Sequence, residues 1–326
     1  MISPTLFKAL RHLSQDEFRS GSAIAQVLGI SRSTLSNILA EADQVGVELY
    51  RIQGRGYRLV EPLDWLRMDE VVKTLDISAK RFDLAIVDTT ESTNADLMAR
   101  AALGAPSGTA LVAEFQSGGR GRRGRRWFSP LCGGLTFSLL WRFNQGAARL
   151  SSLSLAVGVA VARALREIGV ADAQLKWPND IVHHFRKLGG ILIELSGDVL
   201  GPTAVVIGVG INVRLDEQTL TQIDQAAIDL ERVLENVPSR SVVLGNLMRH
   251  LSDVLQQFDR DGFAPFRDEW LAAHAYHDRA VRLFLPRNRV EEGVVSGIGD
   301  DGSLLVQGAD GVKPYTVGEI SLKAAA

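Results

Sequence analysis

Apolar side chains recur at helical spacing through residues 20–43, on both sides of Gly29. The chain turns at this glycine, and the small Ala25 before it lets two helices cross closely. Ser31 stands where its hydroxyl can accept a hydrogen bond from an amide two or three residues further on, as a helix N-cap does. This arrangement predicts a helix-turn-helix. The apolar positions are Ile24, Ala25, Leu28, Ile30, Leu35, Ile38 and Leu39.

Residues 48–62 alternate apolar and polar side chains around Gly54 and Gly56, a pattern typical of a two-stranded hairpin. A hairpin directly after a helix-turn-helix is a wing. Pro62 and the polar segment after it indicate a boundary near residues 61–66. We therefore expect a winged helix-turn-helix domain over residues 1–64.

The middle of the chain alternates strand and helix patterns, which predicts a mixed sheet flanked by helices. Helical periodicity covers residues 95–103, 152–168 and roughly 241–275. We assign residues 65–275 to this central domain and expect an α+β multidomain protein. The predicted strands are residues 84–90, 109–116, 134–143, 174–182, 189–197 and 203–213.

The last segment, residues 280–322, has short alternating runs separated by glycine-aspartate turns. Such a pattern is typical of a small antiparallel β-barrel. We therefore expect a separate barrel domain over residues 276–326.

The 326 residues are more than one hydrophobic core usually serves, so two or three domains are expected. An apolar fraction of 46% and a charged fraction of 23% are those of an ordinary soluble protein without long disorder. The most apolar stretch, residues 153–165, is interrupted by Ser154 and Arg163 and is too short to span a bilayer. We expect a cytoplasmic protein that does not bind membranes.

Few other residues indicate chemistry by their type alone. The single cysteine, Cys132, excludes an internal disulfide and has no neighbouring base in the sequence, so it is interpreted as unreactive. His183 and His184 follow a predicted strand without a partner at metal-ligand spacing. They are interpreted as a surface pair.

The formal net charge is -2, so any affinity for polyanions must come from a local cluster. Residues 119–126, the arginine loop, read GRGRRGRR, and no Asp or Glu occurs from Phe115 to Arg166. Glycines let a backbone approach a ligand, and guanidinium groups clamp carboxylates or phosphates in bidentate fashion. The loop therefore indicates a site for more than one anionic group. Taken alone, the run is equally typical of a solvated or nucleic-acid-binding patch.

The arginine loop also contains the spacing G-x-G-x-x-G at Gly119, Gly121 and Gly124. A dinucleotide-binding turn needs these glycines to open a helix and an acidic residue about twenty positions later. Here the sequence WFSP follows at residues 127–130, and the next acidic residue is Glu167. The context therefore argues against a dinucleotide-binding fold.

The motifs of the central block, in their order and spacing, closely resemble those of the biotin–protein ligase family. With the helix-turn-helix and the barrel, the resemblance covers nearly the full chain and extends to bifunctional ligases that also act as biotin operon repressors. It implies a class II synthetase-like catalytic domain and an SH3-like C-terminal barrel. The matching motifs are ESTN at 91–94, Gln116, GRGRRGRRWFSP at 119–130, KWPND at 176–180, RKLGGILIE at 186–194 and GVGINV at 208–213.

The resemblance implies a biotin site with a neutral end and a charged end. Lys187 resembles the lysine that approaches the reacting carboxylate and the α-phosphate, where a cation stabilises developing charge. Arg120, Gly121 and Arg122 resemble the segment that closes over the biotin carboxylate and the activated phosphate. Fixed cations offset the repulsion between those two anions. The residues that match the pocket for the biotin rings are Ser92, Thr93, Asn94 and Gln116.

The same resemblance implies an ATP and adenylate site. Trp127 resembles the tryptophan that covers the adenine, although a lone tryptophan is more often a core anchor. Asn179 orients either the phosphate or the acceptor lysine, and Asp180 either holds Mg²⁺ or takes the proton from the incoming amine. The sequence WPND is also an ordinary turn. Asn212 is either a ligand contact or a strand-end polar residue. The arginines of this site are Arg120, Arg122 and Arg125.

The DNA-binding half rests on fewer charges. Residues 1–60 carry seven basic and five acidic side chains, a net charge of +2, which is modest for a phosphate binder. The second helix of the motif would read base edges, and the wing would contact phosphates. A dimer would double these contacts. The expected DNA-binding residues are Arg32, Ser33, Thr34, Asn37, Arg55 and Arg58.

The sequence therefore predicts a ligase that forms biotinyl-5′-AMP from biotin and MgATP and then biotinylates a lysine of a biotin carboxyl carrier protein of acetyl-CoA carboxylase. Lys187, Arg122 and Asp180 are the expected catalytic residues. A ligand-promoted homodimer is expected to bind operator DNA. Three alternatives stay open: a lipoate–protein ligase, a ligand-sensing regulator without ligase activity, and a ligase whose N-terminal domain does not bind DNA.

Overall fold

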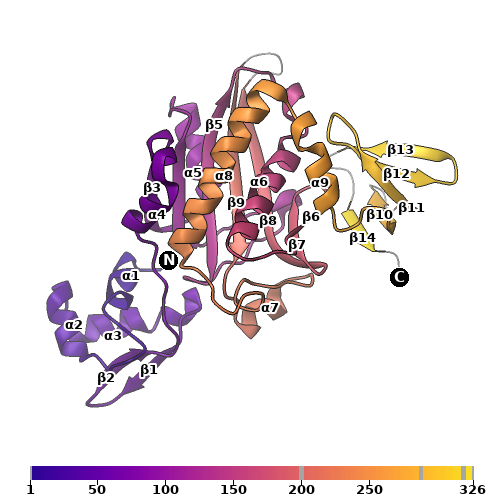
Figure 1. The fold of residues 1–326 in the computed structure, drawn as a ribbon. Coiled ribbons are helices and arrows are strands. Elements are labelled where there is room, and N and C mark those ends of the chain that lie inside the picture. The colour runs from indigo at the N-terminus through magenta and orange to yellow at the C-terminus, as the bar shows by residue number, and fades with distance from the viewer. Residues whose placement is uncertain (1, 198–201, 286–288, 317–320, 325–326) are drawn as a thin grey trace.

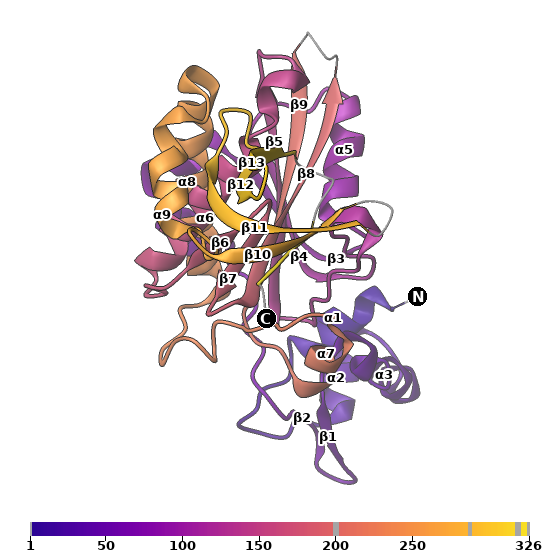
Figure 2. The same cartoon turned by 90° about the vertical axis from the view of Figure 1, so that its right-hand side faces the viewer.

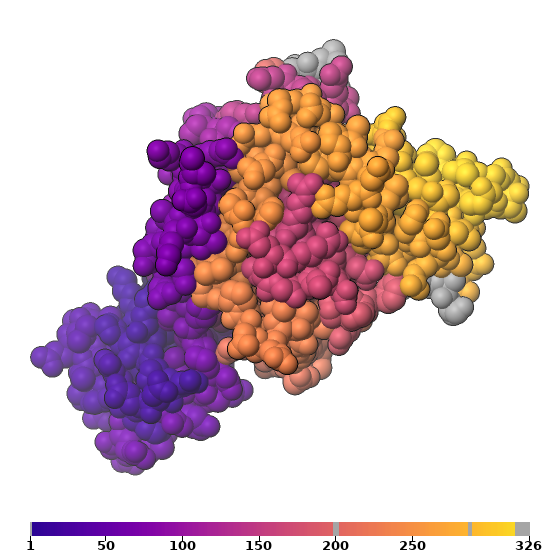
Figure 3. Space-filling view, in the orientation of Figure 1, coloured from indigo at the N-terminus to yellow at the C-terminus, as the bar shows by residue number. Residues whose placement is uncertain are grey.

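The computed structural model describes residues 2–197, 202–285, 289–316 and 321–324. Figure 1 shows a small N-terminal domain, a central sheet with helices packed on it, and a set of C-terminal strands on a different side of that sheet. In the space-filling view of Figure 3, the N-terminal domain forms a lobe of its own beside the central body. The predicted order of a helix-turn-helix, a mixed sheet and antiparallel strands is confirmed.

The N-terminal domain is a winged helix-turn-helix. The Ser31 hydroxyl accepts a hydrogen bond from the Thr34 amide at 3.0 Å, so the predicted N-cap is confirmed. Gly29, with φ of 67°, ends the first helix of the motif as predicted. The first helix of the domain was not predicted because it is only seven residues long. The elements are α1 (Pro4–Leu10), α2 (Gly21–Leu28), α3 (Arg32–Leu39), η1 (Ala42–Val45) and the antiparallel pair β1 (Leu49–Ile52) and β2 (Gly56–Leu59).

The central sheet has seven strands in the order β3-β4-β5-β9-β8-β7-β6. The first two are parallel and the other described pairs are antiparallel, which confirms the predicted mixed sheet. The bounds are β3 (Asp83–Thr90), β4 (Thr109–Gln116), β5 (Gly134–Phe143), β6 (Gln174–Lys176), β7 (Asp180–His183), β8 (Arg186–Gly197) and β9 (Thr203–Asn212).

Helices cover both faces of this sheet. Figures 1 and 2 show α5 (Thr93–Ala102) on one face and α6 (Leu153–Glu167) with α8 (Arg240–Asp261) on the other. Within the described chain, the stretch Ala147–Glu167 is long and apolar enough to cross a membrane, but most of it is buried. It packs in the main hydrophobic core, so we interpret α6 as a core helix.

The helical stretch expected over residues 241–275 is two helices, which corrects the sequence-based prediction. The first, α8, ends before Gly262, and a short turn, η5 (Ala264–Phe266), leads into α9 (Arg267–Ala273). Pro265 in this turn cannot continue a helical hydrogen-bond ladder. The remaining unpredicted elements are the short α4 (Met68–Leu75), η2 (Asp76–Arg81), η3 (Arg122–Gly124), η4 (Ala147–Leu150) and α7 (Glu217–Gln222).

The C-terminal strands form one antiparallel sheet in the order β13-β12-β11-β10-β14. Trp177 of the KWPND motif is buried and donates a hydrogen bond from Nε1 to the Gly302 carbonyl at 3.0 Å. This bond connects the C-terminal sheet to the central domain. The predicted barrel segment also includes residues 286–288, 317–320 and 325–326, which lie outside the described chain. The bounds are β10 (Ala280–Leu285), β11 (Arg289–Ile298), β12 (Leu304–Gly308), β13 (Gly311–Tyr315) and β14 (Ser321–Ala324).

A buried ion pair joins the linker after the wing to the central domain. Glu114 on β4 and Arg240 at the start of α8 are both fully buried and contact each other. The second carboxylate oxygen of Glu114 accepts from the Leu66 amide at 2.8 Å. Arg240 also donates to the carbonyls of Asp64, at 2.8 Å, and Gly134, at 3.0 Å. The pair therefore fixes the linker, the sheet and α8 at one point.

The winged domain also rests directly on the central domain. The Leu131 amide, a few residues after the arginine loop, donates to the Val45 carbonyl at 2.9 Å. Leu131 and Cys132 belong to the hydrophobic core of the winged domain. Burial raises the pKa of the Cys132 thiol to about 12, so it stays protonated at physiological pH. Arg11, the C-cap residue of α1, makes an ion pair with Asp88 of β3 at 2.7 Å.

Replacing Arg240 with Met should strongly destabilise the protein, because the Glu114 carboxylate would stay buried without its partner. We expect a loss of roughly 3–5 kcal/mol, measured as a lower midpoint of thermal unfolding. The double variant Arg240→Met/Glu114→Gln should recover part of the loss. Arg282→Met, which removes an exposed ion pair with Glu292, is the control and should change the midpoint little. Equal midpoints for Arg240→Met and Arg282→Met would contradict a large cost for leaving the Glu114 carboxylate buried without its partner.

Candidate functional site

One cavity of about 370 Å³ opens beside the central sheet, a volume within the range of small-molecule sites. Its walls come from the start of α5, the arginine loop, the KWPND turn, strands β5, β8 and β9, and residues 222–227. Segments that lie far apart in the sequence thus meet at one place. The predicted biotin and ATP residues that line the cavity are Ser92, Thr93, Asn94, Gln116, Arg120, Gly121, Arg122, Arg125, Trp127, Asn179, Asp180, Lys187 and Asn212.

One end of the cavity is a buried network of neutral polar groups. The Gln116 Oε1 atom accepts hydrogen bonds from the amide and the hydroxyl of Thr93, at 2.8 and 3.0 Å. The Ser138 hydroxyl lies 2.6 Å from Asn94 Oδ1 and 2.7 Å from Thr93 Oγ1. Ser92 caps α5 by accepting from the Ala95 amide. These groups are held in place before any ligand arrives.

Ser138 lies within this network, and Glu194 is a partly exposed carboxylate that contacts it; neither received a role from the sequence. Glu194 accepts from Asn94 Nδ2 at 2.8 Å and thereby fixes which way the amide points. Ser138 is fully buried in β5, a strand of mostly apolar residues. A serine inside a buried strand is a signal for a buried polar network, because such a hydroxyl needs a partner. The sequence alone does not say which partner it finds.

The arginine loop supplies the charged end of the cavity. It closes on itself through hydrogen bonds from the Gly121 amide to the Arg125 carbonyl, at 2.7 Å, and from the Trp127 amide to the Gly119 carbonyl, at 2.9 Å. The Arg122 guanidinium donates to Asn179 Oδ1 at 3.1 Å. Burial lowers the pKa of Arg122, and the nearby charge of Arg123 lowers it further. A cation under such conditions gains from a bound anion.

Acidic groups already pair with two cations of the cavity. Lys187 Nζ lies 2.7 Å from Asp180 Oδ1, and Arg120 Nη2 lies 3.7 Å from Glu194 Oε1. Even so, seven basic and two acidic side chains line the cavity. The excess of positive charge favours an anionic ligand at this end. The basic side chains are Arg120, Arg122, Arg123, Arg125, Arg126, Lys176 and Lys187, and the acidic ones are Asp180 and Asp224.

Trp127 forms a flat wall of the cavity and is not a core anchor. The indole lies against Gly210 on β9 and Gly190 on β8, which are partners in the strand register. A Cβ atom on Gly210 would come within 2.5 Å of the ring. The indole is only partly buried, and its Nε1 has no hydrogen-bond partner among the described residues. One surface of the ring is thus available to the cavity.

Asn179 and Asn212 mainly hold the backbone of the site. Asn179 Nδ2 donates to the Ile191 carbonyl at 2.7 Å. Asn212 Nδ2 donates to the carbonyls of Lys187, at 3.2 Å, and Ile228, at 3.0 Å. Both amides therefore position the strand that carries Lys187. Asn212 acts as a structural residue in these contacts, one of the two interpretations that its sequence position allowed.

The segment of residues 222–227 lines the cavity without any sequence signal. Its backbone runs beside Lys187, whose amide donates to the Ala226 carbonyl at 2.8 Å. Gln222, Ile223 and Asp224 contribute side chains to the lining. These residues form no recognisable motif, and only the contact with β8 brings them to the site.

The predicted DNA-binding residues lie on the winged domain, away from the cavity. Arg32, Ser33 and Asn37 are exposed on α3. Thr34 is exposed too, and the Ser33 and Thr34 hydroxyls lie 2.8 and 2.7 Å from Ser31 Oγ at the helix cap. In the wing, the Arg55 and Arg58 guanidinium groups both lie over the Phe18 ring, at 4.9 and 5.0 Å from its centre. The exposed side of α3 therefore offers a polar surface next to a basic wing.

The fold and the cavity define a ligase of the biotin and lipoate type that carries an N-terminal helix-turn-helix. Residues 86–212 match the biotin/lipoate A/B protein ligase family, residues 276–323 match the biotin protein ligase C terminal domain, and residues 5–58 match an HTH domain. The chain belongs to the biotin protein ligase family, as its motifs predicted.

Curated relatives and solved structures agree with this assignment. The chain is 35% identical over 319 residues to the bifunctional ligase/repressor BirA of Escherichia coli, covering 98% of this chain and 97% of that protein. It is 34% identical over 226 residues to a biotin–[acetyl-CoA-carboxylase] ligase of Mycobacterium tuberculosis, covering 68% of this chain and 82% of that protein. The structure of the Aquifex aeolicus biotin protein ligase in complex with biotin and ATP matches with a TM-score of 0.63 and 30% identity, covering 74% of this chain and 99% of that one.

Replacing Gly210 with Ala should force the Trp127 indole off β9, because the new Cβ would overlap the ring. We expect a loss of about 1–3 kcal/mol, measured by thermal unfolding. In the Trp127→Ala background the same change should cost little, since the clash is gone. Gly297→Ala, whose Cβ would meet only Leu305 at 3.7 Å, is the control. Equal effects of Gly210→Ala in both backgrounds would refute the contact.

Proposed function

We propose that this chain is an ATP-dependent biotin–protein ligase and that its winged domain makes it a biotin-responsive repressor. One observation carries the ligase assignment: a single cavity joins a buried neutral hydrogen-bonding network to a cluster of cations beside a flat indole. The substrate must therefore combine a neutral polar group, a carboxylate and a nucleotide. Biotin and ATP together have this chemistry.

The neutral end suits the ring system of biotin. Its urea group offers one carbonyl acceptor and two N–H donors, and a ligand of this kind needs complementary groups that are already fixed. Ser92, Thr93, Asn94 and Gln116 provide such groups at the start of α5 and the end of β4. Gly208 leaves room for this arrangement, because a Cβ there would come within 2.3 Å of Asn94 Oδ1.

In the first step, an oxygen of the biotin carboxylate attacks the α-phosphorus of ATP. The bond from that phosphorus to the bridging oxygen breaks, and pyrophosphate leaves with the electron pair. Arg120, the Gly121 backbone, Arg122 and Lys187 offset the repulsion between the carboxylate and the phosphate. Lys187 Nζ lies 2.7 Å from Asp180 Oδ1, so Lys187 must exchange this partner for the reacting groups.

For the nucleotide, Trp127 offers a stacking surface to adenine and Arg125 a cation to the phosphates. Asn179 and Asn212 keep the strand around Lys187 in register. Mg²⁺ is commonly held by one or two carboxylates together with substrate phosphates. Asp180 and Asp224 line the cavity and fit this requirement, so they would hold the ion, which neutralises phosphate charge when bound.

In the second step, the ε-amine of an acceptor lysine attacks the carbonyl carbon of biotinyl-5′-AMP. The bond from this carbon to the phosphate oxygen breaks, and AMP leaves. The attacking amine must lose a proton, and Asp180, which lines the cavity beside Lys187, would accept it when it does not hold Mg²⁺. We propose a biotin carboxyl carrier protein of acetyl-CoA carboxylase as the acceptor and the cytoplasm as the compartment. The domain bounds of 1–64, 65–275 and 276–326 are part of the same proposal.

The decisive experiment incubates the pure protein with MgATP, a biotin carboxyl carrier domain and either biotin or lipoate. A biotin-sized mass increase on the carrier, with release of AMP and pyrophosphate, is expected. Transfer of lipoate but not biotin would identify the lipoate–protein ligase alternative. Binding of biotin and ATP without release of either product would identify a regulator that only senses ligand.

Lys187→Met should slow adenylate formation by about 100-fold or more, because one preorganised cation is lost while the length of the side chain is preserved. The measurement is the rate of pyrophosphate release.

Trp127→Ala should instead weaken ATP binding by about 1–3 kcal/mol and leave biotin binding intact. Lys80→Met, at an exposed lysine on η2, is the control and should behave as the unmodified protein. Near-normal pyrophosphate release by folded Lys187→Met would refute the assignment.

The repressor role rests on the winged domain and on its direct contact with the segment that follows the arginine loop. The Leu131 to Val45 hydrogen bond connects the two. We propose that the bound adenylate neutralises the arginine loop, orders it and favours a homodimer. The dimer presents two copies of the exposed face of α3 to operator DNA. The proposed DNA contacts are Arg32, Ser33, Thr34, Asn37, Arg55 and Arg58.

Biotin with ATP should tighten binding to the protein's own promoter DNA by roughly 5- to 150-fold, the range that coupling between two sites commonly gives. Sedimentation tests the dimer, and fluorescence anisotropy tests the DNA affinity, each with and without both ligands. Arg32→Ala should weaken DNA binding and leave biotinylation unchanged, whereas the control Arg81→Ala, on the catalytic domain, should affect neither. If the ligands change neither dimerisation nor DNA affinity, the winged domain has only a structural role.

A further inference from the structure

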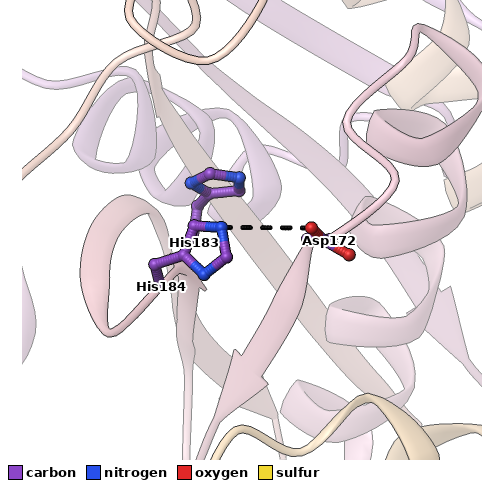
Figure 4. Close-up of side chains that lie close together, drawn as sticks. All are labelled: Asp172, His183 and His184. Carbon is purple, nitrogen blue, oxygen red and sulfur yellow. Dashed lines mark ion pairs between the residues drawn. The ribbon is translucent and has the colours of Figure 1, made fainter.

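A second group of chemically capable side chains lies outside the ligase cavity. Figure 4 shows Asp172, His183 and His184 close together. Asp172 lies in the loop between α6 and β6, and the histidines lie at the end of β7 and in its turn into β8. The sequence interprets the two histidines as a surface pair, and the fold adds Asp172 beside them from another loop. Sequence spacing does not reveal this.

The three side chains have nearly the geometry of a metal site. One potential ligand atom from each residue lies within 4.8 Å of those from the other two. His184 Nε2 and Asp172 Oδ2 are 3.9 Å apart, and the two imidazole ring centres are 4.2 Å apart. Ligands about 2 Å from a shared ion lie roughly 3–4 Å from one another. The three potential ligand atoms therefore lie close to the separations of a coordinated set, and the Asp172 and His184 side chains are exposed.

The backbone holds the histidines in an unusual turn. Strand register pairs His183 with Arg186, so the β7–β8 hairpin turns on His184 and Phe185 alone. Both turn residues have positive φ, 47° and 62°, where Asn and Gly are the usual choices. A bulky residue in this region is strained and persists only when its surroundings hold it, and such strain concentrates at functional positions. Here the Phe185 ring packs against the Tyr276 ring, with 5.3 Å between the ring centres.

The state of His183 suits coordination. Metal ions bind imidazole through the lone pair of a ring nitrogen. The Nδ1 atom of His183 is buried and has no hydrogen-bond partner among the described residues. A buried ring nitrogen without a partner is uncommon, and coordination would supply one.

We propose that Asp172, His183 and His184 bind one late first-row divalent ion, such as Zn²⁺, Co²⁺ or Ni²⁺, with water in the remaining positions. Two imidazoles and a carboxylate suit these ions, whereas Mg²⁺ prefers oxygen ligands alone. The site is separate from the Mg²⁺ proposed at Asp180, which lies at the other end of β7. A bound ion ties the α6–β6 loop to the hairpin that carries Lys187, and so stabilises the folded protein.

The test uses the full-length chain without an affinity tag, freed of metal by chelation. Titration with Co²⁺ should give the visible absorption of a bound ion and saturate at one equivalent per chain. Zn²⁺ should raise the midpoint of thermal unfolding, and the same concentration of Mg²⁺ without nucleotide should not. His184→Gln and Asp172→Asn change exposed side chains, so these variants should stay folded while losing at least about tenfold in Co²⁺ affinity.

The matched control is His250→Gln, which removes a histidine that also pairs with a carboxylate, Glu167 at 2.8 Å, but belongs to no such group of three among the described residues. It should keep full Co²⁺ affinity. Three results would overturn the proposal: less than one equivalent of Co²⁺ bound at saturation, unchanged affinity in both His184→Gln and Asp172→Asn, or an equal loss in His250→Gln. Because biotinylation is not measured, these results are independent of the ligase assignment.

Discussion

The buried ion pair between Glu114 and Arg240 is the contact on which the arrangement of the domains depends. Two charges without solvent are stable only when each keeps its partner and the remaining hydrogen-bonding groups are satisfied. Here the Leu66 amide and the carbonyls of Asp64 and Gly134 complete the shell. The pair thus requires the linker, β4, β5 and α8 to come together in one way. A buried pair of this kind specifies an arrangement more than it adds net stability.

The Glu114–Arg240 ion pair also determines where the ligase site lies. Gln116 follows Glu114 by two residues on β4, and Gly134 begins β5, so the arginine loop is anchored at both ends by strands that the ion pair aligns. Beyond the loop, Leu131 and Cys132 enter the core of the winged domain. The loop that supplies the cations and the surface that supports the winged domain are therefore one continuous segment. A ligand that rearranges the arginine loop therefore acts on a segment whose far end is packed in the winged domain.

The cavity carries an excess of positive charge, part of which is offset by partners within the protein. At least three of its cationic side chains have polar or acidic partners within the protein, and these contacts must be exchanged when an anion binds. Trp127 and the glycines beneath it provide a rigid apolar wall that needs no such exchange. Part of the free energy of ligand binding therefore offsets the loss of these internal contacts. The pairs are Lys187 with Asp180, Arg120 with Glu194 and Arg122 with Asn179.

The sequence by itself determined the features that depend on neighbours along the chain: the helix-turn-helix with its Ser31 cap, the wing, the strand pattern of the central sheet, and the arginine loop and KWPND motifs. Cap, turn and periodicity are local properties, so they can be read from a short stretch. Only the tertiary structure decided that Ser138 and Glu194 complete the polar network, that residues 222–227 close the cavity, that Arg240 reaches Glu114, and that Asp172 joins His183 and His184. These contacts depend on the order in which strands pair and on which loops lie side by side in the fold. Tertiary packing sets both, so the spacing of residues along the chain does not reveal them.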